Sequence, residues 1–214
     1  MPRRRSGATL GGPGLRSHHK PGRRGSGLLT TTAVLAFALL AYALPAPASE
    51  TAAWDGLRSG GHLALIRHAL APGTGDPGAF ALDDCGTQRN LSEEGRAQAA
   101  RIGARFRAKG IEAARVLSSQ WCRCLETAEL LDLGPVEALS ILNSFFQRRE
   151  NEGRQTRALE AWAAEQNLDG PVVLVTHQVN ITALTGVFPT SGEMVVIRRS
   201  EDGGLSVVGT IETD

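Results

Sequence analysis

The segment Leu63-Ala64-Leu65-Ile66-Arg67-His68 places four apolar residues in a row before two basic ones. An unbroken apolar run of this length predicts a strand buried on both faces. Similar runs follow at Arg115-Val116-Leu117-Ser118 and Val172-Val173-Leu174-Val175, and a second histidine, His177, comes just after the last of them. Helical patterns separate the runs. The sequence therefore predicts a three-layer α/β/α sandwich with a mostly parallel central sheet and an antiparallel edge.

The segments between these strands carry helix and turn signals. Ser92 is a suitable N-cap, followed by two acids in the first turn, where the helix dipole favours negative charge, and Gly110 closes this helix. We expect further helices at about 120–133, 156–167 and 179–186, and a terminal hairpin at 193–198 and 205–211. Residues 69–90 are rich in Gly, Pro and Asp, which predicts a long loop of the kind that often carries function. Residues 49–60 are expected to be a short entry segment before the first strand.

The N-terminal segment is typical of a bacterial secretory signal. Residues 1–27 contain seven basic side chains and no acid, residues 28–44 are apolar or small, and Ala46-Pro47-Ala48 follows as a small-x-small site. We expect cleavage after Ala48 and a periplasmic or secreted folded domain at 49–214. The alternative is an uncleaved N-terminal membrane anchor, because 17 apolar residues can just span a bilayer. Arg23-Arg24 raises the twin-arginine export route as a minor option.

Removal of residues 1–48 would change the charge of the protein. The whole chain has a net charge of +1, but that segment holds seven of the 23 Lys and Arg and none of the 22 Asp and Glu, which leaves about −6. An acidic domain lacks the basic face that nucleic-acid binding needs, so we expect no nucleic-acid partner. Any anion site must be a local cluster of arginines.

Three cysteines, Cys85, Cys122 and Cys124, lie in the predicted domain. In an oxidising compartment a disulfide is favoured, and Cys85 would pair with one of the other two, because residues 122 and 124 point to different sides of a helix. A free buried thiol is the alternative. The spacing is wrong for a zinc site, so we expect no metal.

Two predicted strands each end at a histidine, His68 and His177. Ligands bind beyond the carboxyl ends of strands in open α/β sheets, so the two imidazoles could share one cleft. Arg67 adjoins the first histidine, and Arg123 lies early in the helix after the second strand. Guanidinium groups match phosphate oxygens with paired hydrogen bonds. The pattern therefore indicates a site for a phosphate-like dianion.

With these residues the sequence resembles an exported bacterial member of the histidine phosphatase (phosphoglycerate mutase-like) superfamily. The resemblance spans about residues 62–200 and implies that 49–214 form a histidine phosphatase domain. Four motifs occur in family order, and they are Leu65-Ile66-Arg67-His68-Ala69, Asn90-Leu91-Ser92-Glu93-Glu94-Gly95-Arg96-Ala97-Gln98-Ala99, Ser118-Ser119-Gln120-Trp121-Cys122-Arg123-Cys124-Leu125-Glu126-Thr127-Ala128 and Val175-Thr176-His177.

The resemblance implies a mechanism. His68 would attack phosphorus and become phosphohistidine, while Arg67, Arg123 and His177 bind the phosphoryl group and stabilise its oxygens. Water would then hydrolyse the intermediate. No metal and no cofactor are expected, since arginines supply the positive charge.

The general acid is less clearly marked. Gln178 after His177 departs from the family branch in which an Asp follows this histidine. The other branch takes its acid from a Glu some 25–30 residues after the second arginine, which makes Glu150 the first choice, with Glu152 as the alternative. Arginines beside Glu150 favour its ionised form, however. Asp76 on the loop is a further candidate, and good leaving groups could do without an acid.

These residues leave three functions open. The first is an exported phosphomonoesterase acting on a small phosphorylated substrate, such as a sugar phosphate or a phosphorylated envelope glycan. The second is a mutase-type phosphotransferase. The third is a non-catalytic phosphate-binding or envelope-interaction module. Gly73-Thr74-Gly75-Asp76-Pro77-Gly78 lacks the ending of a nucleotide-binding loop, although it could still supply backbone amides or Thr74 to a substrate. Trp121, Phe145 and Phe146 are either cleft walls or core residues, and core packing is favoured.

Overall fold

The computed structural model describes residues 50–213, which form a layered α/β domain. The predicted signal segment and its cleavage site lie outside the described residues. Six strands form one sheet in the order β3-β2-β4-β1-β5-β6. Their bounds are β1 His62–Arg67, β2 Arg115–Ser118, β3 Val136–Ala138, β4 Val172–Thr176, β5 Met194–Arg199 and β6 Leu205–Ile211.

The sheet is mostly parallel with an antiparallel edge, as the sequence predicted. β1 pairs in parallel with β4, and β4 with β2, which in turn pairs with β3. β5 runs antiparallel to β1, and β6 antiparallel to β5. β1 therefore lies between β4 and β5 in the interior of the sheet, where both of its backbone edges are hydrogen-bonded.

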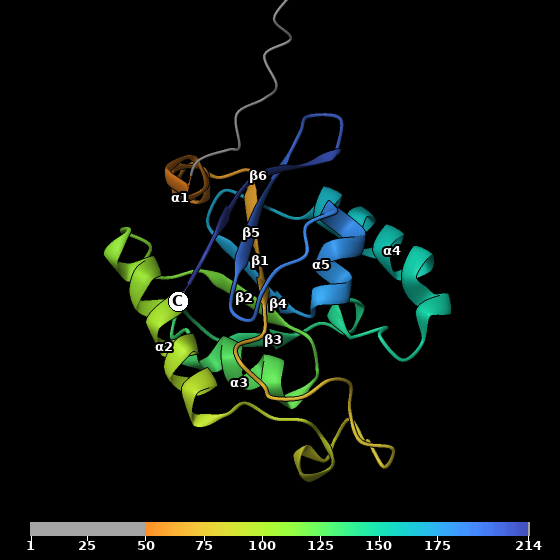
Figure 1. Ribbon diagram of the computed structural model, residues 1–214. Coiled ribbons are helices and arrows are strands. Elements are labelled where there is room, and N and C mark those ends of the chain that lie inside the picture. The colour runs from red at the N-terminus through yellow and green to blue at the C-terminus, as the bar shows by residue number, and fades with distance from the viewer. Residues whose placement is uncertain (1–49, 214) are drawn as a thin grey trace, which may run out of the picture. The chain divides into compact units, whose positions relative to one another are not determined.

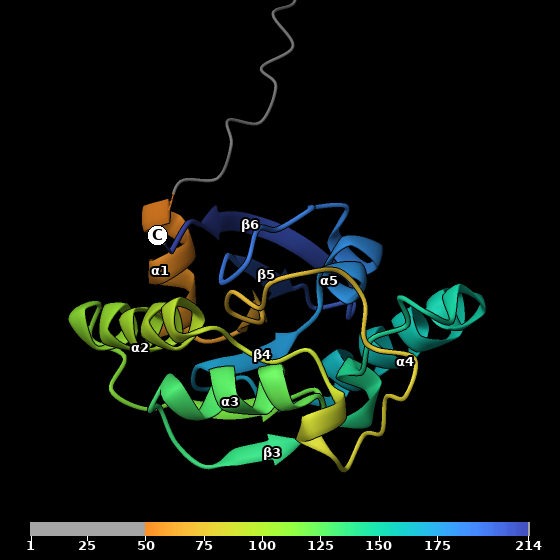
Figure 2. The same ribbon diagram turned by 60° about the horizontal axis from the view of Figure 1, so that its bottom comes forward.

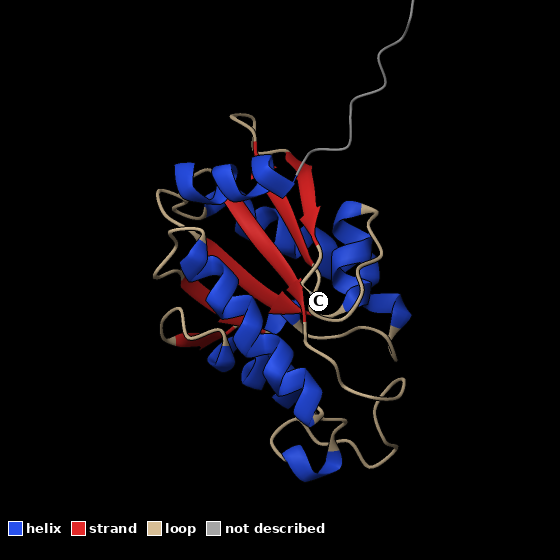
Figure 3. Ribbon diagram, turned by 60° about the vertical axis from the view of Figure 1, so that its left-hand side comes forward, coloured by secondary structure: helices blue, strands red, loops and turns tan. Residues whose placement is uncertain are grey.

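Five helices within residues 50–213 cover the two faces of the sheet. They are α1 Glu50–Ser59, α2 Glu93–Ala108, α3 Cys122–Leu130, α4 Glu152–Glu165 and α5 Gln178–Thr185. In Figure 1, α1, α2 and α3 lie on one side of the strands and α4 and α5 on the other. Figure 3 shows the same sandwich with the strands in red between helices in blue. None of these helices is long and apolar enough to cross a membrane.

The continuous apolar run of β1 explains why both faces are covered. Leu63 and Leu65 point into a core shared with α4 and α5, whereas Ala64 and Ile66 point into a core shared with the helices of the other face. All four side chains are fully buried. Alternate residues of a strand face opposite sides, so a strand that is apolar at every position needs a layer on each side.

Local signals explain how α2 is placed beside the strand ends. The Ser92 side chain accepts a hydrogen bond from the Gly95 amide at 3.0 Å, which caps the helix. Gly95 itself packs against backbone, since a Cβ there would lie 2.0 Å from the Leu70 carbonyl oxygen. The absence of a side chain thus lets the start of α2 approach the chain two residues after His68.

The structure adds detail to three expectations. The entry segment expected at 49–60 is helical, because Glu50–Ser59 form α1, whose Ala53, Trp54 and Leu57 are buried. β3 was not predicted, since a three-residue edge strand carries too short a pattern. The helix expected at 156–167 begins earlier, at Glu152, directly after a 3-10 turn at Arg149–Asn151.

Candidate active site

The two predicted histidines lie side by side at the carboxyl ends of neighbouring strands. β1 and β4 are in register with Arg67 opposite Thr176, so His68 and His177 each follow directly after a strand end. The His68 amide donates to the Thr176 carbonyl at 2.9 Å, and the two imidazole centroids are 5.5 Å apart. Each histidine is 3 % exposed. The parallel pairing therefore brings together residues that are 109 positions apart in the sequence.

The two predicted arginines reach the same place from different elements. Arg123, in the first turn of α3, points its Nη2 at His177 Nδ1 from 3.5 Å. Arg67 donates from Nη1 to the Pro189 carbonyl at 2.9 Å. The Nε atoms of both arginines are buried and have no hydrogen-bond partner among the described residues. Both residues line the cavity, and guanidinium groups there are suited to an anionic ligand.

The environment of His68 holds its ring neutral in one tautomer. Its Nδ1 lies 2.8 Å from the Ala69 carbonyl oxygen, which can only accept, so Nδ1 carries the hydrogen and Nε2 keeps its lone pair. Burial, and then the positive charge of Arg123, holds the pKa of His68 well below its usual 6.5. A neutral imidazole with a fixed tautomer is what attack on phosphorus requires.

His177 is held in the complementary way. Because the Arg123 guanidinium donates to Nδ1, the ring hydrogen lies on Nε2, which is 2.8 Å from the Ser119 hydroxyl. Ser119 in turn donates to the Asn143 side-chain oxygen at 3.3 Å. Burial, followed by the nearby His68, lowers the pKa of His177 well below 6.5, so this ring is also neutral. Sequence reasoning did not identify Ser119 or Asn143 as residues that orient the site.

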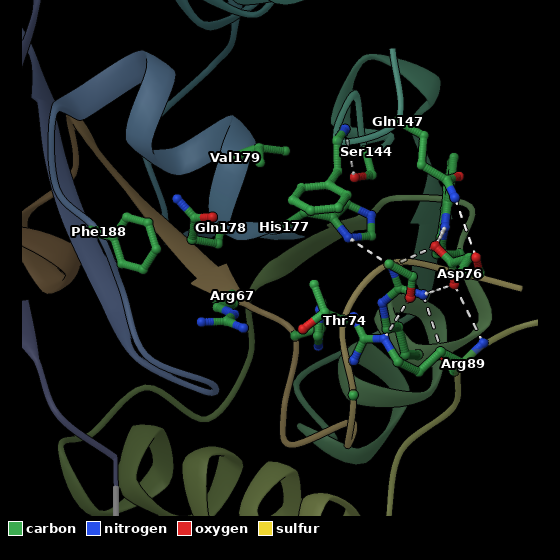
Figure 4. Close-up of a pocket in the computed structure, with 16 residues that line it drawn as sticks. Arg67, Thr74, Asp76, Arg89, Ser144, Gln147, His177, Gln178, Val179 and Phe188 are labelled. Atoms are coloured by element: carbon green, nitrogen blue, oxygen red, sulfur yellow. Dashed lines mark hydrogen bonds and ion pairs between the residues drawn. The ribbon is translucent and has the colours of Figure 1, made fainter. Parts of the chain in front are cut away.

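These groups line one cavity of about 280 Å³. Figure 4 shows Arg67, Arg89, Asp76 and His177 around it. The lining also includes backbone or side chains from the glycine-rich loop, α5 and the segments around 146 and 188, and its members are Arg67, His68, Gly73, Thr74, Gly75, Asp76, Arg89, Trp121, Arg123, Ser144, Phe146, Gln147, His177, Gln178, Val179 and Phe188. Within residues 50–213, no cluster of three or more His, Cys, Asp or Glu side chains is placed to hold a metal ion.

Arg89 is a third arginine in the cavity that the sequence reading missed. Its Nε donates to the Gly75 carbonyl at 2.8 Å and its Nη1 donates to the Ala71 carbonyl, so it fastens the loop that follows β1. Burial and the neighbouring Arg123 lower the pKa of its guanidinium, which still leaves it charged at neutral pH. The sequence feature that could have identified Arg89 is its position directly before the Asn90-Leu91-Ser92 motif at the start of α2.

Asp76 is the one carboxylate among the described residues that line the cavity. Its two oxygens accept from Arg123 Nη1 at 2.6 Å and Nη2 at 3.2 Å, and one also accepts from Trp121 Nε1 at 3.0 Å. Burial alone would raise the pKa of Asp76, but the hydrogen bonds and charge of Arg123 outweigh it and lower the pKa. Asp76 is therefore ionised at neutral pH.

The structure does not bring Glu150 or Glu152 to the cavity. Both side chains are exposed, at the 3-10 turn and the start of α4, and neither lines the site. The aromatic residues divide as well. Phe145 is buried in the core as expected, and Trp121 packs against the core as expected but also lines the cavity. Phe146 lines the cavity and is 40 % exposed, so the expected core packing was wrong for it.

A disulfide joins the loop to α3. Cys85 pairs with Cys122, with Cα atoms 5.7 Å apart, which confirms the predicted bridge and selects between its two candidate partners. Cys124 is a buried free thiol, and burial raises its pKa to about 12. Its sulfur lies 3.5 Å from His177 Nε2 and packs as a neutral group. Cys122 immediately precedes Arg123, so the bridge fastens the loop next to the anion site.

Comparison with known proteins agrees with this geometry. Residues 63–143 match the family model of the histidine phosphatase superfamily (branch 1), a segment that includes Arg67, His68 and Arg123. Over this segment the chain is similar to the histidine phosphatase superfamily, the family that its motifs resemble. No curated protein sequence gives a significant match.

Solved structures share the fold. The protein histidine phosphatase SixA, solved with tungstate, superposes with a TM-score of 0.52 at 19 % identity, covering 71 % of this chain and 97 % of that chain. Mycobacterial hydrolase 1 gives 0.51 at 17 %, covering 69 % and 95 %. The product of open reading frame Rv3214 of Mycobacterium tuberculosis gives 0.50 at 17 %, covering 68 % and 94 %. At this identity the likeness shows the fold, which is the predicted phosphoglycerate mutase-like one.

Proposed function

We propose that this histidine phosphatase is an exported, metal-independent phosphomonoesterase that works through a phosphohistidine at His68. The observation that carries the proposal is the convergence of two neutral buried imidazoles and three arginines on one cavity. Such a site neutralises a dianion with fixed guanidinium groups, which is the main requirement of phosphoryl transfer.

In the first step His68 Nε2 attacks phosphorus, the N–P bond forms, and the P–O bond to the leaving group breaks. The guanidinium groups of Arg67 and Arg123, which line the cavity, would donate to the phosphoryl oxygens. In the second step water attacks phosphorus, the N–P bond breaks, and phosphate leaves with His68 restored. Both steps develop charge on the same oxygens, so the same arginines stabilise both transition states.

Asp76 is our candidate for proton transfer in place of Glu150, because it lines the cavity and Glu150 does not. It is ionised at neutral pH, held so by Arg123. A bound phosphate dianion would draw on the same guanidinium and place negative charge beside the carboxylate. Both effects raise a carboxyl pKa, so substrate binding favours the protonated form that can donate to the leaving oxygen.

Export and substrate are further parts of the proposal. The basic leader, the apolar segment and Ala46-Pro47-Ala48 support export to the periplasm or beyond, with membrane attachment only through the N-terminal segment if it is uncleaved. The Cys85–Cys122 bridge fits an oxidising compartment. The expected substrates are small phosphorylated compounds that occur there, sugar phosphates or phosphorylated envelope glycans.

The test is hydrolysis of p-nitrophenyl phosphate in EDTA. We expect steady phosphate release, a loss of at least about a thousand-fold in His68→Ala, and an acid-labile phosphoenzyme trapped from labelled substrate in the unsubstituted protein. His62→Ala is the matched control, since His62 lies at the other end of the same strand and should leave turnover unchanged. Activity that is destroyed by EDTA but survives His68→Ala would overturn the proposal.

One observation favours a second candidate, a phosphate-binding module without turnover. The Arg123 guanidinium is already paired with Asp76, and no Glu of the 149–152 turn reaches the cavity. This alternative predicts that phosphate raises the melting temperature while no phosphohistidine forms. A mutase-type phosphotransferase would form phosphohistidine but pass it to a sugar, which rapid quench with labelled substrate distinguishes from transfer to water.

A further inference from the structure

Two exposed phenylalanine rings stand at the mouth of the cavity. Among the described residues, four large apolar side chains are exposed, namely Leu70, Phe146, Phe188 and Val207. Both phenylalanines line the cavity, with Phe188 72 % exposed and Phe146 40 % exposed. Exposed aromatic rings at the rim of a concave site mark a surface that a ligand covers.

Each phenylalanine lies near groups that are expected to bind phosphate. Phe188 directly precedes Pro189, whose carbonyl accepts the 2.9 Å hydrogen bond from Arg67. Phe146 lies over the glycine-rich loop, since an atom at the Cβ position of Gly75 would be 3.8 Å from its ring. The Arg149 guanidinium covers one face of the Phe146 ring, 5.1 Å from its centroid.

Both rings line the cavity that also holds the two histidines and the three arginines. In Figure 4, Phe188 lies on the side of Arg67 and Gln178. Phe146 reaches the cavity beside the glycine-rich loop, next to Gly75. A phosphate bound by the arginines would therefore place its leaving group near these aromatic rings.

The chemistry of the two phenylalanine rings favours one kind of leaving group. A phenylalanine ring has no hydrogen-bonding atom, so it binds through apolar contact with a flat face or with C–H edges. The amide and hydroxyl groups of Gln147, Gln178 and Thr74 add hydrogen bonds for polar substituents. A cavity of about 280 Å³ is at the small end of ligand pockets, which suits one ring and its phosphate.

We propose that the site is selective for phosphate monoesters of a six-membered ring, and that Phe146 and Phe188 are its specificity-determining residues. The shared chemistry is a ring that stacks on phenylalanine, either a pyranose or an aryl group. An open-chain polyol phosphate has the same hydroxyl groups but no rigid flat face. The inference rests on the proposed function, since it concerns the leaving group of that reaction.

The test compares three esters of primary alcohols, so that leaving-group reactivity is similar. Glucose 6-phosphate carries a pyranose, benzyl phosphate an aryl ring, and sorbitol 6-phosphate the same six carbons as an open chain. We expect at least one ring ester to exceed sorbitol 6-phosphate in kcat/KM by about ten-fold. Phe188→Ala and Phe146→Ala should each lower the favoured ring ester by about three- to ten-fold and leave sorbitol 6-phosphate unchanged. Val207→Ala is the matched control, an exposed apolar residue on β6 outside the cavity.

Binding of the same esters to the His68→Ala protein, measured by calorimetry, separates this inference from the proposed function. Ring-selective binding that the phenylalanine variants abolish supports the inference even if the unsubstituted protein has no turnover. Equal kcat/KM for ring and open-chain esters, or variants that weaken both alike, would overturn it while leaving the phosphatase intact. The ester with the higher kcat/KM, glucose 6-phosphate or benzyl phosphate, identifies which kind of ring the two phenylalanines bind.

Discussion

The two strand-end histidines and the loop beside them contribute to the same cavity, but different contacts hold them in place. His68 and His177 sit at the ends of hydrogen-bonded strands in the middle of the sheet, so the backbone pairing of β1 with β4 sets their positions. Asp76 and Arg89 come from the β1–α2 loop, residues 69–90, which has no sheet partner beyond an isolated bridge between Ala81 and Asp84. Figure 2 shows this loop, in yellow, reaching the start of α3.

The loop compensates with side-chain contacts and a covalent bond. Arg89 fastens two loop carbonyls, Asp76 accepts from Trp121 and Arg123, and Cys85 is bonded to Cys122. The difference indicates a division of roles. Backbone pairing positions the two histidines, while the disulfide-bonded loop places further charged groups around them.

The largest effect among the strand-end residues is expected for His177→Ala. We expect kcat to fall by about 10²- to 10³-fold, because a preorganised polar group beside the phosphoryl oxygens is lost. Stopped-flow and steady-state phosphate release would measure it. Ser119→Ala should fall less, since it removes only the partner that orients the ring. If Ser119→Ala is as damaging as His177→Ala, orientation rather than direct contact is the role of this histidine.

The corresponding test of the loop half is Arg89→Ala. We expect a roughly ten-fold rise in KM and in the inhibition constant of phosphate, with a smaller change in kcat, because a positive charge and two loop contacts disappear. Arg101→Ala on the outer face of α2 is the matched control, as its ion pair with Glu94 is exposed. A change in kcat as large as that of His177→Ala would show that the loop is as closely involved as the strand ends.

Removal of the Cys85–Cys122 disulfide should have a milder effect on activity. In the Cys85→Ser/Cys122→Ser double variant we expect KM to rise about three-fold, and the free energy of unfolding to fall by about 2–4 kcal/mol, as for other disulfides closing loops of this size. Chemical denaturation and phosphate-release assays would measure both. Cys124→Ser controls for the buried thiol. Unchanged KM together with lowered stability would mean that the bridge serves folding alone.

The smallest expected effect is a displacement of the pH profile. Because burial and Arg123 hold the pKa of His68 below 6.5, the acid limb of kcat/KM should lie below pH 6.5. Arg123→Gln removes one of those causes and should move the limb to higher pH. Stability follows the same sign: unfolded histidines take up protons near pH 6.5 while the buried ones do not, so acidification below that value favours unfolding. A limb above pH 6.5 in the unsubstituted protein would contradict a neutral His68.

The sequence predicted the core of the site because its residues lie at the ends of regular elements. Arg67, His68 and His177 follow strands whose apolar runs are unambiguous, and parallel strands end at the same edge of a sheet. Arg123 was found through its place at the start of a helix. The loop residues were harder to read, since no periodicity fixes a loop, and Arg89 was missed although it directly precedes a recognised motif.

The candidate proton donors show most clearly what the sequence could not predict. Counting residues from Arg123 selected Glu150, yet the 3-10 turn at Arg149–Asn151 places it in solvent, while Asp76 lines the cavity from a loop. Likewise the cysteine count predicted a bridge to Cys85 but left two partners open. Spacing along a chain gives no direction in space outside regular elements, so these choices depended on tertiary contacts.

The sequence by itself determined the layered sheet, the two strand-end histidines and the arginines beside them, because hydrophobic periodicity fixes which segments are buried strands and where they end. The tertiary structure alone decided that Arg89 and Asp76 join the site, that Cys122 is the partner of Cys85, and that Phe146 and Phe188 form its walls. Those contacts join elements that are distant in the chain, and their geometry is set by packing.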